Sequence, residues 1–595
     1  MADAPTASPD AAFEIPERAW LVASVVILLV ATAVRLYAPD LKPMHHDEGV
    51  NGHFLTNLLR QGAYRYDPNN YHGPTLYYLS LPVVALFGLT TFAVRLITVL
   101  FGVGIVWLVL SLRRYIGTVG ALAAAALVAV SPGCVYYSRY FIHEIPFVFF
   151  TLGIVVAALR FYETGAAHYL LLASASAAML FATKETAFIS VGTLALAWLV
   201  AWLWMKLQGD GREKSRDIGS VVAETGLAKF GASGQSPGVV AVAVVLFVAI
   251  WVLFYSSFFT NWPGVVDSFR AYVVWKKTGM SEFHGKSLYT YVQWLWQAEA
   301  PILILAAVGS CVALFERRRN RFAIFAGAWG FGLLAAYSLI SYKTPWLMLS
   351  FVVPLAIVGG YAVQVLSRME WKRLLPLLLA FAVGAYLLER QRDALSDVYL
   401  SLTSIGYQSA KGYAGVPLLL LGCVILSAAF VIAVKWAVGG GAFRWRRSLV
   451  VAGLALAVCT YQTLVLNFRQ YDNDGYIYVY SHTRRQFLDM LKEVERAAGV
   501  AGQKEPGITV ASGEYWPLPW YFRDNTHAGY VNSVAASYDP QSTLMIIGRK
   551  SDNPRDDQYE RLRTVLGSAY VEAGVYSLRP GVDLVLFERR DLARK

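Results

Sequence analysis

The sequence predicts an all-α polytopic membrane protein with a small α/β domain after its last span. Hydrophobic residues make up 56% of the 595 residues and charged residues only 15%, whereas soluble domains carry roughly a quarter charged residues. The apolar residues also form runs of roughly 20, which is the length of a helix that crosses a bilayer. The C-terminal end alternates helix and strand patterns instead. We therefore expect a multi-pass protein of the cell membrane.

The apolar runs predict about 13 transmembrane helices. They cover residues 19–37, 92–112, 119–137, 146–162, 169–187, 188–205, 238–259, 300–315, 322–341, 346–366, 374–389, 416–436 and 448–468. We interpret residues 1–18 as a cytoplasmic tail and residues 19–468 as the transmembrane domain. A shorter apolar segment, residues 76–89, contains Pro82, so we expect a helix that lies in the outer leaflet without crossing. The first outer loop then covers residues 38–91.

The basic residues agree with this topology. If the N-terminus lies in the cytoplasm, every dense basic cluster falls in a cytoplasmic loop, as the positive-inside rule requires. The clusters are Arg113 and Arg114; Arg212, Lys214 and Arg216; Arg317, Arg318, Arg319 and Arg321; Arg368, Lys372 and Arg373; and Arg444, Arg446 and Arg447. The topology accounts for the formal net charge of +12, so we expect the lipid bilayer and no nucleic acid as a partner.

The last predicted span leaves residues 469–595 as an extracytoplasmic domain. Apolar residues at helical spacing predict a helix over residues 483–498. Short apolar runs at residues 507–511, 544–548 and 584–587 predict buried strands. Together these elements predict a small α/β domain on the outer face.

The first outer loop opens with two histidines and two carboxylates, His45, His46, Asp47 and Glu48. A carboxylate at this place could act as a general base toward a hydroxyl acceptor or hold a divalent cation such as Mg or Mn. The simpler interpretation is that Asp47 or Glu48 caps the helix that follows. The two roles are compatible, and the residues alone leave both open.

Further charged residues fall at the same predicted outer interface. Glu144 lies in the short second outer loop, where Arg139 is a potential ion-pair partner. Lys184 and Lys343 lie at the outer ends of two predicted spans. A lysine at this depth is a natural partner for phosphate, although it could also extend toward the lipid headgroups. Carboxylates and lysines on one side suit a substrate with a phosphate at the headgroup level and an apolar tail in the bilayer.

Several motifs follow one another in an order that is typical of one superfamily. The pair Asp47-Glu48 follows the first span, residues 72–78 read His-Gly-Pro-Thr-Leu-Tyr-Tyr, and Ser138-Arg139, Glu144 and Thr183-Lys184 come next. This order resembles the GT-C superfamily of membrane glycosyltransferases, which includes protein O-mannosyltransferases, the lipid A aminoarabinose transferase and oligosaccharyltransferase subunits. The sequence departs from the superfamily pattern at two positions, because Gly73 stands for a proline and Glu144 for the usual Asp.

Two stretches narrow the resemblance within this superfamily. They are His46-Asp47-Glu48-Gly49 and Lys343-Thr344-Pro345-Trp346. Both look most similar to the flippase activity-associated proteins of archaeal N-glycosylation, a group that also has bacterial members.

The resemblance implies an inverting glycosyltransferase that takes its sugar from a polyprenyl phosphate on the extracytoplasmic side. The acceptor is a glycan, a lipid or a protein. By this resemblance Asp47 is the general base, with Glu48 as its catalytic neighbour. The implied substrate-binding residues are His46, His72, Arg139, His143, Lys184, Glu185 and Lys343, and the candidate ligand for a divalent metal is Glu144. Consistent with a lipid-linked donor, the cytoplasmic loops contain no P-loop or Rossmann fingerprint for a nucleotide sugar.

Two other classes stay open at this point. A flippase for lipid-linked sugars also needs a polar site among apolar helices, but it favours charges near the midplane and an internal repeat. This sequence places its charges at one interface and has no evident repeat. A flippase-associated membrane protein or scaffold without transferase activity is the other class, and in such a protein the loss of Asp47 would be harmless.

Overall fold

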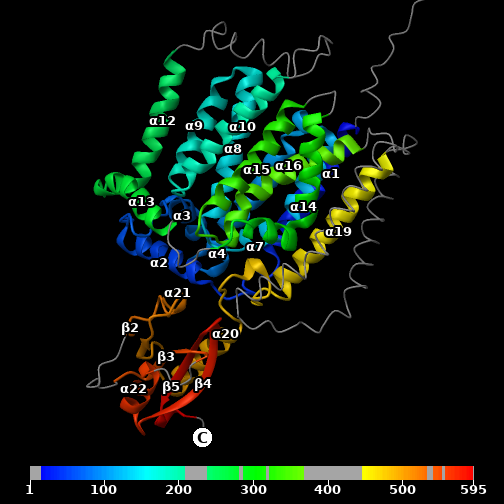
Figure 1. The fold of residues 1–595 in the computed structure, drawn as a ribbon. Helices are drawn as coiled ribbons and strands as arrows, with labels where there is room; N and C mark the ends of the chain where they lie inside the picture. Colours follow the sequence, from blue (N-terminus) through cyan, green and yellow to red (C-terminus); the bar gives the residue numbers. More distant parts are fainter. Residues whose placement is uncertain are drawn as a thin grey trace, which may run out of the picture.

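The computed structural model describes residues 15–207, 237–279, 286–315, 320–366, 445–532, 541–552 and 557–593. Within these ranges the chain forms a bundle of apolar helices and a small α/β domain, which lies at one end of the bundle (Figure 1). The predicted fold class is therefore confirmed.

Nine helices of the described residues are long and apolar enough to cross a membrane, and up to ten if a bent pair counts as one span. The long apolar helices are α1 (Glu17–Leu36), α4 (Thr91–Leu110), α8 (Glu144–Thr164), α10 (Ala187–Leu207), α12 (Pro237–Tyr255), α14 (Thr290–Phe315), α15 (Arg321–Leu339), α16 (Leu349–Leu366, continuing the short 3-10 helix η3, Pro345–Met348) and α19 (Trp445–Phe468). Each overlaps a predicted span, and α14 begins well before its predicted start at residue 300. The predicted spans at residues 374–389 and 416–436 lie outside the described residues.

The predicted span at residues 119–137 is broken in the structure. Helices α6 (Thr118–Ala129) and α7 (Pro132–Ser138) are bent by 56° relative to each other. The residue before a proline is disfavoured in helical conformation, and Ser131 begins the new helix instead, with its side chain accepting a hydrogen bond from the Cys134 amide. The expectation of one continuous helix was wrong because it overlooked this Ser-Pro pair.

The remaining helices of the bundle are shorter. They are α2 (His46–Gln61), α3 (Thr75–Phe87), α5 (Arg113–Ile116), α9 (Ala167–Phe181) and α13 (Pro263–Gly279). Helix α3 is the apolar segment expected in the outer leaflet. The start of α3 is buried in the protein at Leu76 and Tyr77, whereas Leu86 and Phe87 near its end are exposed.

Helix α16 forms the centre of the bundle, since all of its residues are buried. Glycines allow its neighbours to approach closely: a Cβ atom on Gly360 would lie 2.3 Å from the Gly120 carbonyl oxygen of α6, and one on Gly309 of α14 would lie 2.1 Å from the Val358 carbonyl oxygen. Close approach at small residues is a common way for helices to pack in a membrane, where water provides no hydrophobic driving force between them.

The C-terminal domain contains a five-stranded sheet of order β2-β1-β3-β5-β4, in which β1 pairs in parallel with β2 and β3, and β5 pairs antiparallel with β3 and β4. Its elements are η5 (Ile477–Val479), α20 (Gln486–Val500), β1 (Ile508–Ala511), α21 (Leu518–Tyr521), β2 (Ala528–Val531), β3 (Leu544–Lys550), α22 (Asp557–Leu566), β4 (Tyr570–Arg579), β5 (Val582–Arg589) and η6 (Arg590–Leu592). Alternate residues of the strands pack on α20 and on α22, so the two helices cover opposite faces.

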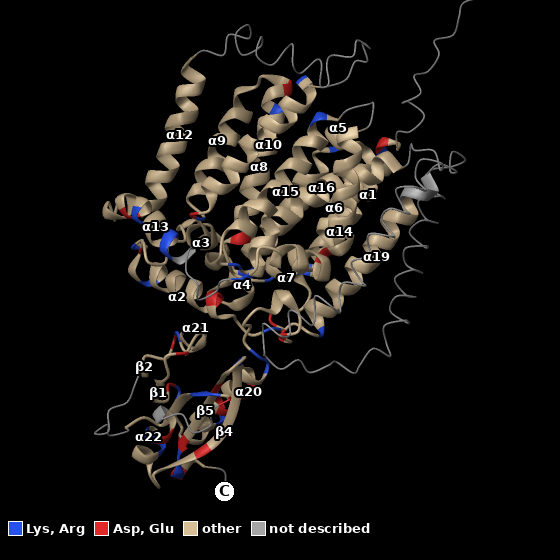
Figure 2. Cartoon of the chain, in the orientation of Figure 1, with Lys and Arg blue, Asp and Glu red and all other residues tan. Residues whose placement is uncertain are grey.

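Charged residues gather at the two ends of the bundle (Figure 2). The end far from the C-terminal domain carries Arg113 and Arg114 of α5, and Arg321 starts α15 next to them, since Asn320 donates to the Tyr115 carbonyl oxygen at 2.6 Å. The other end carries the acidic and lysine residues that the sequence analysis selected. The structure thus separates the described basic clusters from the candidate site, as the predicted topology requires.

Candidate active site

The candidate site is built around the first turn of α2. His45 caps this helix, because its Nδ1 accepts a hydrogen bond from the Asp47 amide at 3.0 Å, while the Glu48 carboxylate accepts one from the His45 amide at 3.0 Å. This reciprocal arrangement is a capping box. The sequence left open which carboxylate caps the helix, and in the structure it is that of Glu48. The Asp47 carboxylate is not part of the capping box.

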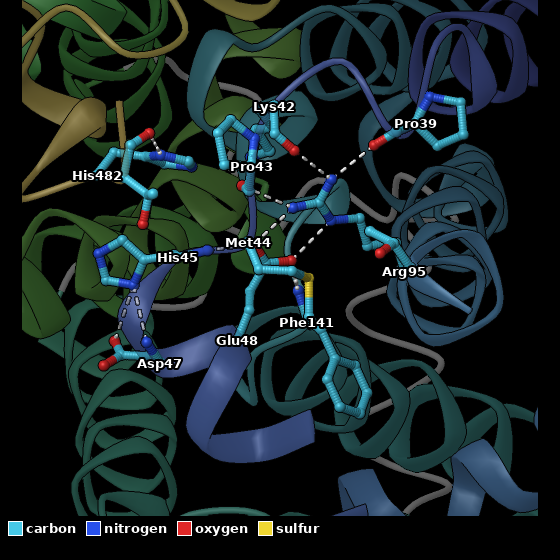
Figure 3. A network of polar contacts seen from close by, with 12 residues as sticks. Pro39, Lys42, Pro43, Met44, His45, Asp47, Glu48, Arg95, Phe141 and His482 are labelled. Atoms are coloured by element: carbon cyan, nitrogen blue, oxygen red, sulfur yellow. Dashed lines mark hydrogen bonds and ion pairs between the residues drawn. The ribbon is translucent and has the colours of Figure 1, made fainter. Parts of the chain in front are cut away.

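Glu48 is held in a buried ion pair with Arg95 of α4 (Figure 3). Both side chains have 0% exposure, and their two contacts measure 2.8 Å and 2.7 Å. The Phe141 amide adds a hydrogen bond of 2.8 Å to Glu48, and the carbonyl oxygens of Pro39, Lys42 and Pro43 accept the remaining Arg95 donors. These partners occupy both carboxylate oxygens, which favours a structural role for Glu48, and its expected catalytic role stays a prediction.

Asp47 lies in a different environment from its neighbour. Figure 3 shows its carboxylate directed away from the Arg95 network, and it is 3.8 Å from His45 Nδ1 and 41% exposed. Partial dehydration by the surrounding protein and the negative charge of Glu144 raise the pKa of Asp47 to about 6, although His72, Lys184 and Arg579 act in the opposite direction. An accessible carboxylate with such a pKa is suited to accept a proton near neutral pH.

A second acidic cluster joins α8 to the loop between α9 and α10. Glu144 forms a buried ion pair with Lys184, and His72 Nδ1 is 3.0 Å from Glu185. Burial by itself lowers the pKa of Lys184, but the Glu144 and Glu185 carboxylates more than offset this and raise it. The ring of His143 lies 4.9 Å from that of His72. The structure therefore brings together five of the predicted residues.

The glycine at position 73 explains how these loops meet. The Gly73 amide donates to the Thr183 carbonyl oxygen at 3.0 Å, and the Thr75 amide donates to that of Ala182 at 3.2 Å. A Cβ atom at Gly73 would lie 2.0 Å from the Ala182 carbonyl oxygen. The departure from the superfamily pattern at this position is thus a requirement of the close approach, and proline could not supply the amide that is used.

Lys343 lies in the connection between α15 and η3. Its Nζ donates to the carbonyl oxygens of Ile340 at 2.6 Å and Lys286 at 3.3 Å. Lys286 was not selected from the sequence, yet its Nζ lies 4.8 Å from the centre of the Tyr480 ring. Burial and the charge of Lys343 lower the pKa of Lys286. Lys343 and Lys286 thus place two ammonium groups at this part of the site. Neither has a carboxylate among its described contacts.

Arg139 is separated from the acidic cluster. Its guanidinium donates to the carbonyl oxygens of Tyr37 at 2.9 Å, Ala38 at 2.7 Å and Asn467 at 3.2 Å, and it lies over the Phe468 ring. These contacts tie the end of α1 to the end of α19. They favour a structural role for Arg139, whose substrate-binding role stays a prediction. The ion pair that the sequence offered between Arg139 and Glu144 is replaced by the Glu144–Lys184 pair.

The C-terminal domain contributes a residue that the sequence analysis missed. Arg579, the last residue of β4, has its Nη1 3.3 Å from His46 Nδ1 and also pairs with Glu514. Burial and the Arg579 charge lower the pKa of His46 to about 4, so this histidine is neutral near pH 7. No local sequence signal points to Arg579, because it reaches α2 only through the docking of the two domains.

The described residues contain no group of three or more His, Cys, Asp and Glu side chains that could hold an ion. The carboxylate of the candidate metal ligand Glu144 is paired with Lys184. The divalent metal suggested by the sequence stays a prediction.

Comparisons with known proteins concern the fold and one segment of the chain. Residues 71–209 match the family model for dolichyl-phosphate-mannose-protein mannosyltransferase. The structure resembles that of ArnT from Cupriavidus metallidurans bound to undecaprenyl phosphate, with a TM-score of 0.61, 15% identity and coverage of 97% of this chain and 100% of that chain. For the same protein in the apo state the TM-score is 0.62, with 15% identity and coverage of 97% and 99%. The protein has the GT-C fold. No curated protein sequence matches the chain.

These findings confirm the resemblance to the GT-C membrane glycosyltransferases. The matched residues 71–209 include His72, His143, Glu144, Lys184 and Glu185 of the site. The narrower resemblance to flippase activity-associated proteins stays a prediction, as do the roles of the individual site residues.

Proposed function

We propose that this GT-C protein transfers a sugar from a polyprenyl phosphate to a hydroxyl acceptor on the extracytoplasmic side of the membrane, with inversion at the anomeric carbon. The observation that carries the proposal is the accessible Asp47 carboxylate, which lies beside an acidic and lysine cluster at one end of an apolar bundle. A polyprenyl phosphate matches this layout, since its phosphate is charged and its tail is apolar. The related ArnT structure was solved with such a lipid.

The proposed reaction is a direct displacement. The acceptor hydroxyl attacks the anomeric carbon, a new carbon–oxygen bond forms, and the bond from that carbon to the phosphate oxygen breaks. The hydroxyl proton passes to Asp47, and the departing phosphate takes the electron pair. Attack from the side opposite the phosphate inverts the anomeric centre.

Basic side chains stabilise the departing phosphate in this proposal. Lys343 and Lys286 lie close together with no carboxylate among their described contacts, and Lys184 lies in the cluster with Glu144. Cations placed where negative charge develops lower the barrier most effectively when they are already fixed before the reaction. His72 and His143 are proposed to bind the sugar hydroxyls, and Glu185 orients His72 through their 3.0 Å contact.

The donor class can be tested with wild-type protein reconstituted in lipid vesicles. Polyprenyl phosphates carrying different radiolabelled sugars are added with acceptor extracts, and transfer of the label to a product is measured. The proposal expects transfer from the lipid-linked donor and none from the corresponding nucleotide sugar. Movement of the lipid-linked sugar across the vesicle membrane without transfer would contradict the proposal and support the flippase alternative.

A further inference from the structure

Helix α13 follows the membrane-spanning helix α12 without continuing it. Helix α12 has 19 residues, little of it is buried in the protein, and at 1.5 Å per residue it is roughly 28 Å long, close to the thickness of the hydrocarbon core. A tight turn follows, in which a Cβ atom on Gly264 would lie 2.2 Å from the Tyr255 carbonyl oxygen. Helix α13 therefore begins at one edge of the hydrocarbon core, and it lies across the end of α12 (Figure 1).

The turn between α12 and α13 is fixed at the end of the bundle that holds the candidate site. Ser257 Oγ accepts a hydrogen bond from the Tyr64 amide at 2.9 Å and lies 2.6 Å from the Tyr78 hydroxyl. Both tyrosines belong to the segment between α1 and α4 that also carries the candidate base. On the α13 side, the ring of Tyr272 lies 6.0 Å from that of Phe188 in α10. Helix α13 is thus level with the membrane interface at which the candidate site lies.

One face of α13 is apolar and exposed. Val266, Phe269 and Val273 are each more than half exposed, and their spacing of three and four residues places them on the same side of the helix. Trp262, just before the helix, is also more than half exposed, whereas Ala271 packs into the protein. An exposed apolar face of this kind marks contact with a membrane or with another protein.

Cationic side chains border this apolar face. Arg270 pairs with Asp267 at 2.8 Å, so these two charges compensate each other. Lys276 and Lys277 are exposed in the last turn of α13, and neither has a carboxylate partner among the residues that the structure describes. An apolar face with aromatic residues and unpaired lysines is typical of a helix that lies in the plane of a membrane interface. The flexible lysine side chains can then extend to the phosphate groups of the lipids.

We infer that α13 lies in the membrane interface at the candidate-site end, with the face of Val266, Phe269 and Val273 among the lipid chains and with Lys276 and Lys277 bound to the phosphate of an anionic phospholipid. The tight turn keeps α13 level with the end of α12, which favours the bilayer over a protein partner. The two uncompensated lysines favour an anionic lipid over a zwitterionic one. The inference does not depend on the proposed function, because no residue of the candidate site takes part in it.

The position of α13 in the membrane can be tested with a fluorescent probe. Val273→Cys, made in a parent chain whose native cysteines are replaced by serine, is labelled with an environment-sensitive dye and reconstituted in phosphatidylcholine vesicles. We expect quenching by phospholipids that carry a nitroxide near the headgroup and protection from iodide in the water. The matched control is Val500→Cys, which labels an equally apolar and exposed position of the C-terminal domain and should show the reverse pattern.

The anionic lipid is tested with the same labelled chain. Quenching by spin-labelled phosphatidylglycerol is compared with quenching by spin-labelled phosphatidylcholine, which gives the relative association constant of the anionic lipid at α13. Each lysine close to an anionic lipid surface contributes about fivefold to binding, so Lys277→Gln should lower this constant by about fivefold, and the further change Lys276→Gln should lower it again. Lys504→Gln removes an exposed lysine of the C-terminal domain and should leave the constant unchanged.

Three outcomes would overturn the inference. Iodide quenching of the probe at position 273 without lipid quenching would place α13 in water. Shielding of the probe from both quenchers would mean that a second copy or another protein covers the apolar face. Equal association of the two spin-labelled lipids, or displacement of phosphatidylglycerol by an equal amount of polyprenyl phosphate, would show that the lysines do not select an anionic phospholipid.

Discussion

At the scale of single residues, two adjacent carboxylates of the same helix turn have opposite surroundings. Successive residues of a helix point about 100° apart, so Glu48 reaches inward to Arg95, whereas the Asp47 side chain is 41% exposed. One carboxylate is fully compensated by charge and hydrogen bonds, and the other stays available to a substrate. Glu48 is therefore placed to stabilise the structure, and Asp47 is placed to take part in the proposed reaction.

Replacing Glu48 should therefore affect folding first. Glu48→Gln leaves the buried Arg95 guanidinium without its counter-ion, and the loss of one partner of a buried ion pair typically costs about 3–5 kcal/mol. We expect a decrease of this size in the free energy of unfolding, measured by denaturant titration in detergent. The control is Glu17→Gln, which breaks the exposed pair with Arg113 and should change the stability by less than about 1 kcal/mol. Equal stability of Glu48→Gln and wild type would refute the structural role.

The pH dependence of transfer should report the ionisation of Asp47. A general base works only when it is deprotonated, and the pKa of Asp47 is about 6. Transfer, measured as kcat/KM, should thus be low under more acidic conditions, rise with pH through a midpoint near 6 and level off above it. A profile that stays flat through this range, with the protein shown to remain folded, would mean that another group accepts the proton.

Much of the candidate site could be predicted residue by residue, but the contacts of Arg139 could not. A carboxylate or lysine between apolar spans is costly unless it is used, and this reasoning selected Asp47, Glu144, Lys184 and Lys343. It could not separate Arg139 from them, since the backbone carbonyl groups that Arg139 satisfies belong to distant segments and leave no trace in the local sequence.

At the scale of elements, the position of α2 under the outer domain depends on two glycines. A Cβ atom on Gly52 would lie 2.4 Å from the Trp520 ring, and one on Gly49 would lie 2.7 Å from Pro517 Cβ. Such separations are too short for a carbon contact, so a side chain at either place forces the α21 region away from α2. Docking of the two domains is thus encoded by the absence of side chains on one face of the helix.

Gly52→Ala should weaken this docking. Overpacking at a close contact typically costs about 1–3 kcal/mol, so we expect lower thermal stability and a loss of transfer activity in the same variant. Gly192→Ala in α10 is the matched control, because a Cβ atom there meets nothing within 4 Å, and alanine favours a helix over glycine. Full activity and unchanged stability of Gly52→Ala would show that the outer domain does not depend on this contact.

The elements themselves were predicted well where their pattern is strong. Apolar runs long enough to span a bilayer gave the described long helices, and continuous buried runs gave β1, β3 and β5. Strands β2 and β4 were missed because their residues are only partly buried and lack a clear apolar pattern. The break between α6 and α7 was missed because the apolar composition continues across Ser131 and Pro132.

At the scale of the whole molecule, the bundle has two chemically different ends. One carries the arginines of α5 and the start of α15, and the other carries the candidate site and the C-terminal domain. By the positive-inside rule the arginine-rich end is expected in the cytoplasm. The site would then face outward, where lipid-linked sugars replace nucleotide sugars as donors.

Cysteine labelling in intact cells tests this orientation. Lys504→Cys places a thiol on the exposed surface of the outer domain, and Arg114→Cys places one at the opposite end. A membrane-impermeant maleimide should label the first variant in intact cells and the second only after permeabilisation, with the parent chain as the blank for its native cysteines. The reverse pattern would place the site in the cytoplasm and contradict the proposed donor.

The whole-molecule arrangement explains why the sequence revealed the site only in part. The predicted topology alone assigned Asp47, Glu144, Lys184 and Lys343 to one membrane interface. In the structure these residues lie at the same end of the bundle (Figure 2). Arg579 lies more than 500 residues after Asp47 in the chain, as the separation of 533 positions between His46 and Arg579 shows. Only the three-dimensional docking of the domains makes it part of the site.

The most direct test of the account compares two aspartates of the first outer loop. Asp47→Asn and Asp67→Asn each remove one carboxylate from the same loop, but Asp67 lies on the exposed surface and accepts hydrogen bonds from Asn69 in a local turn. Transfer of labelled sugar from a polyprenyl phosphate is measured for both in lipid vesicles. We expect that Asp67→Asn keeps wild-type activity, while Asp47→Asn remains folded and loses about 10²- to 10⁴-fold in rate. Wild-type transfer by a folded Asp47→Asn would contradict the account.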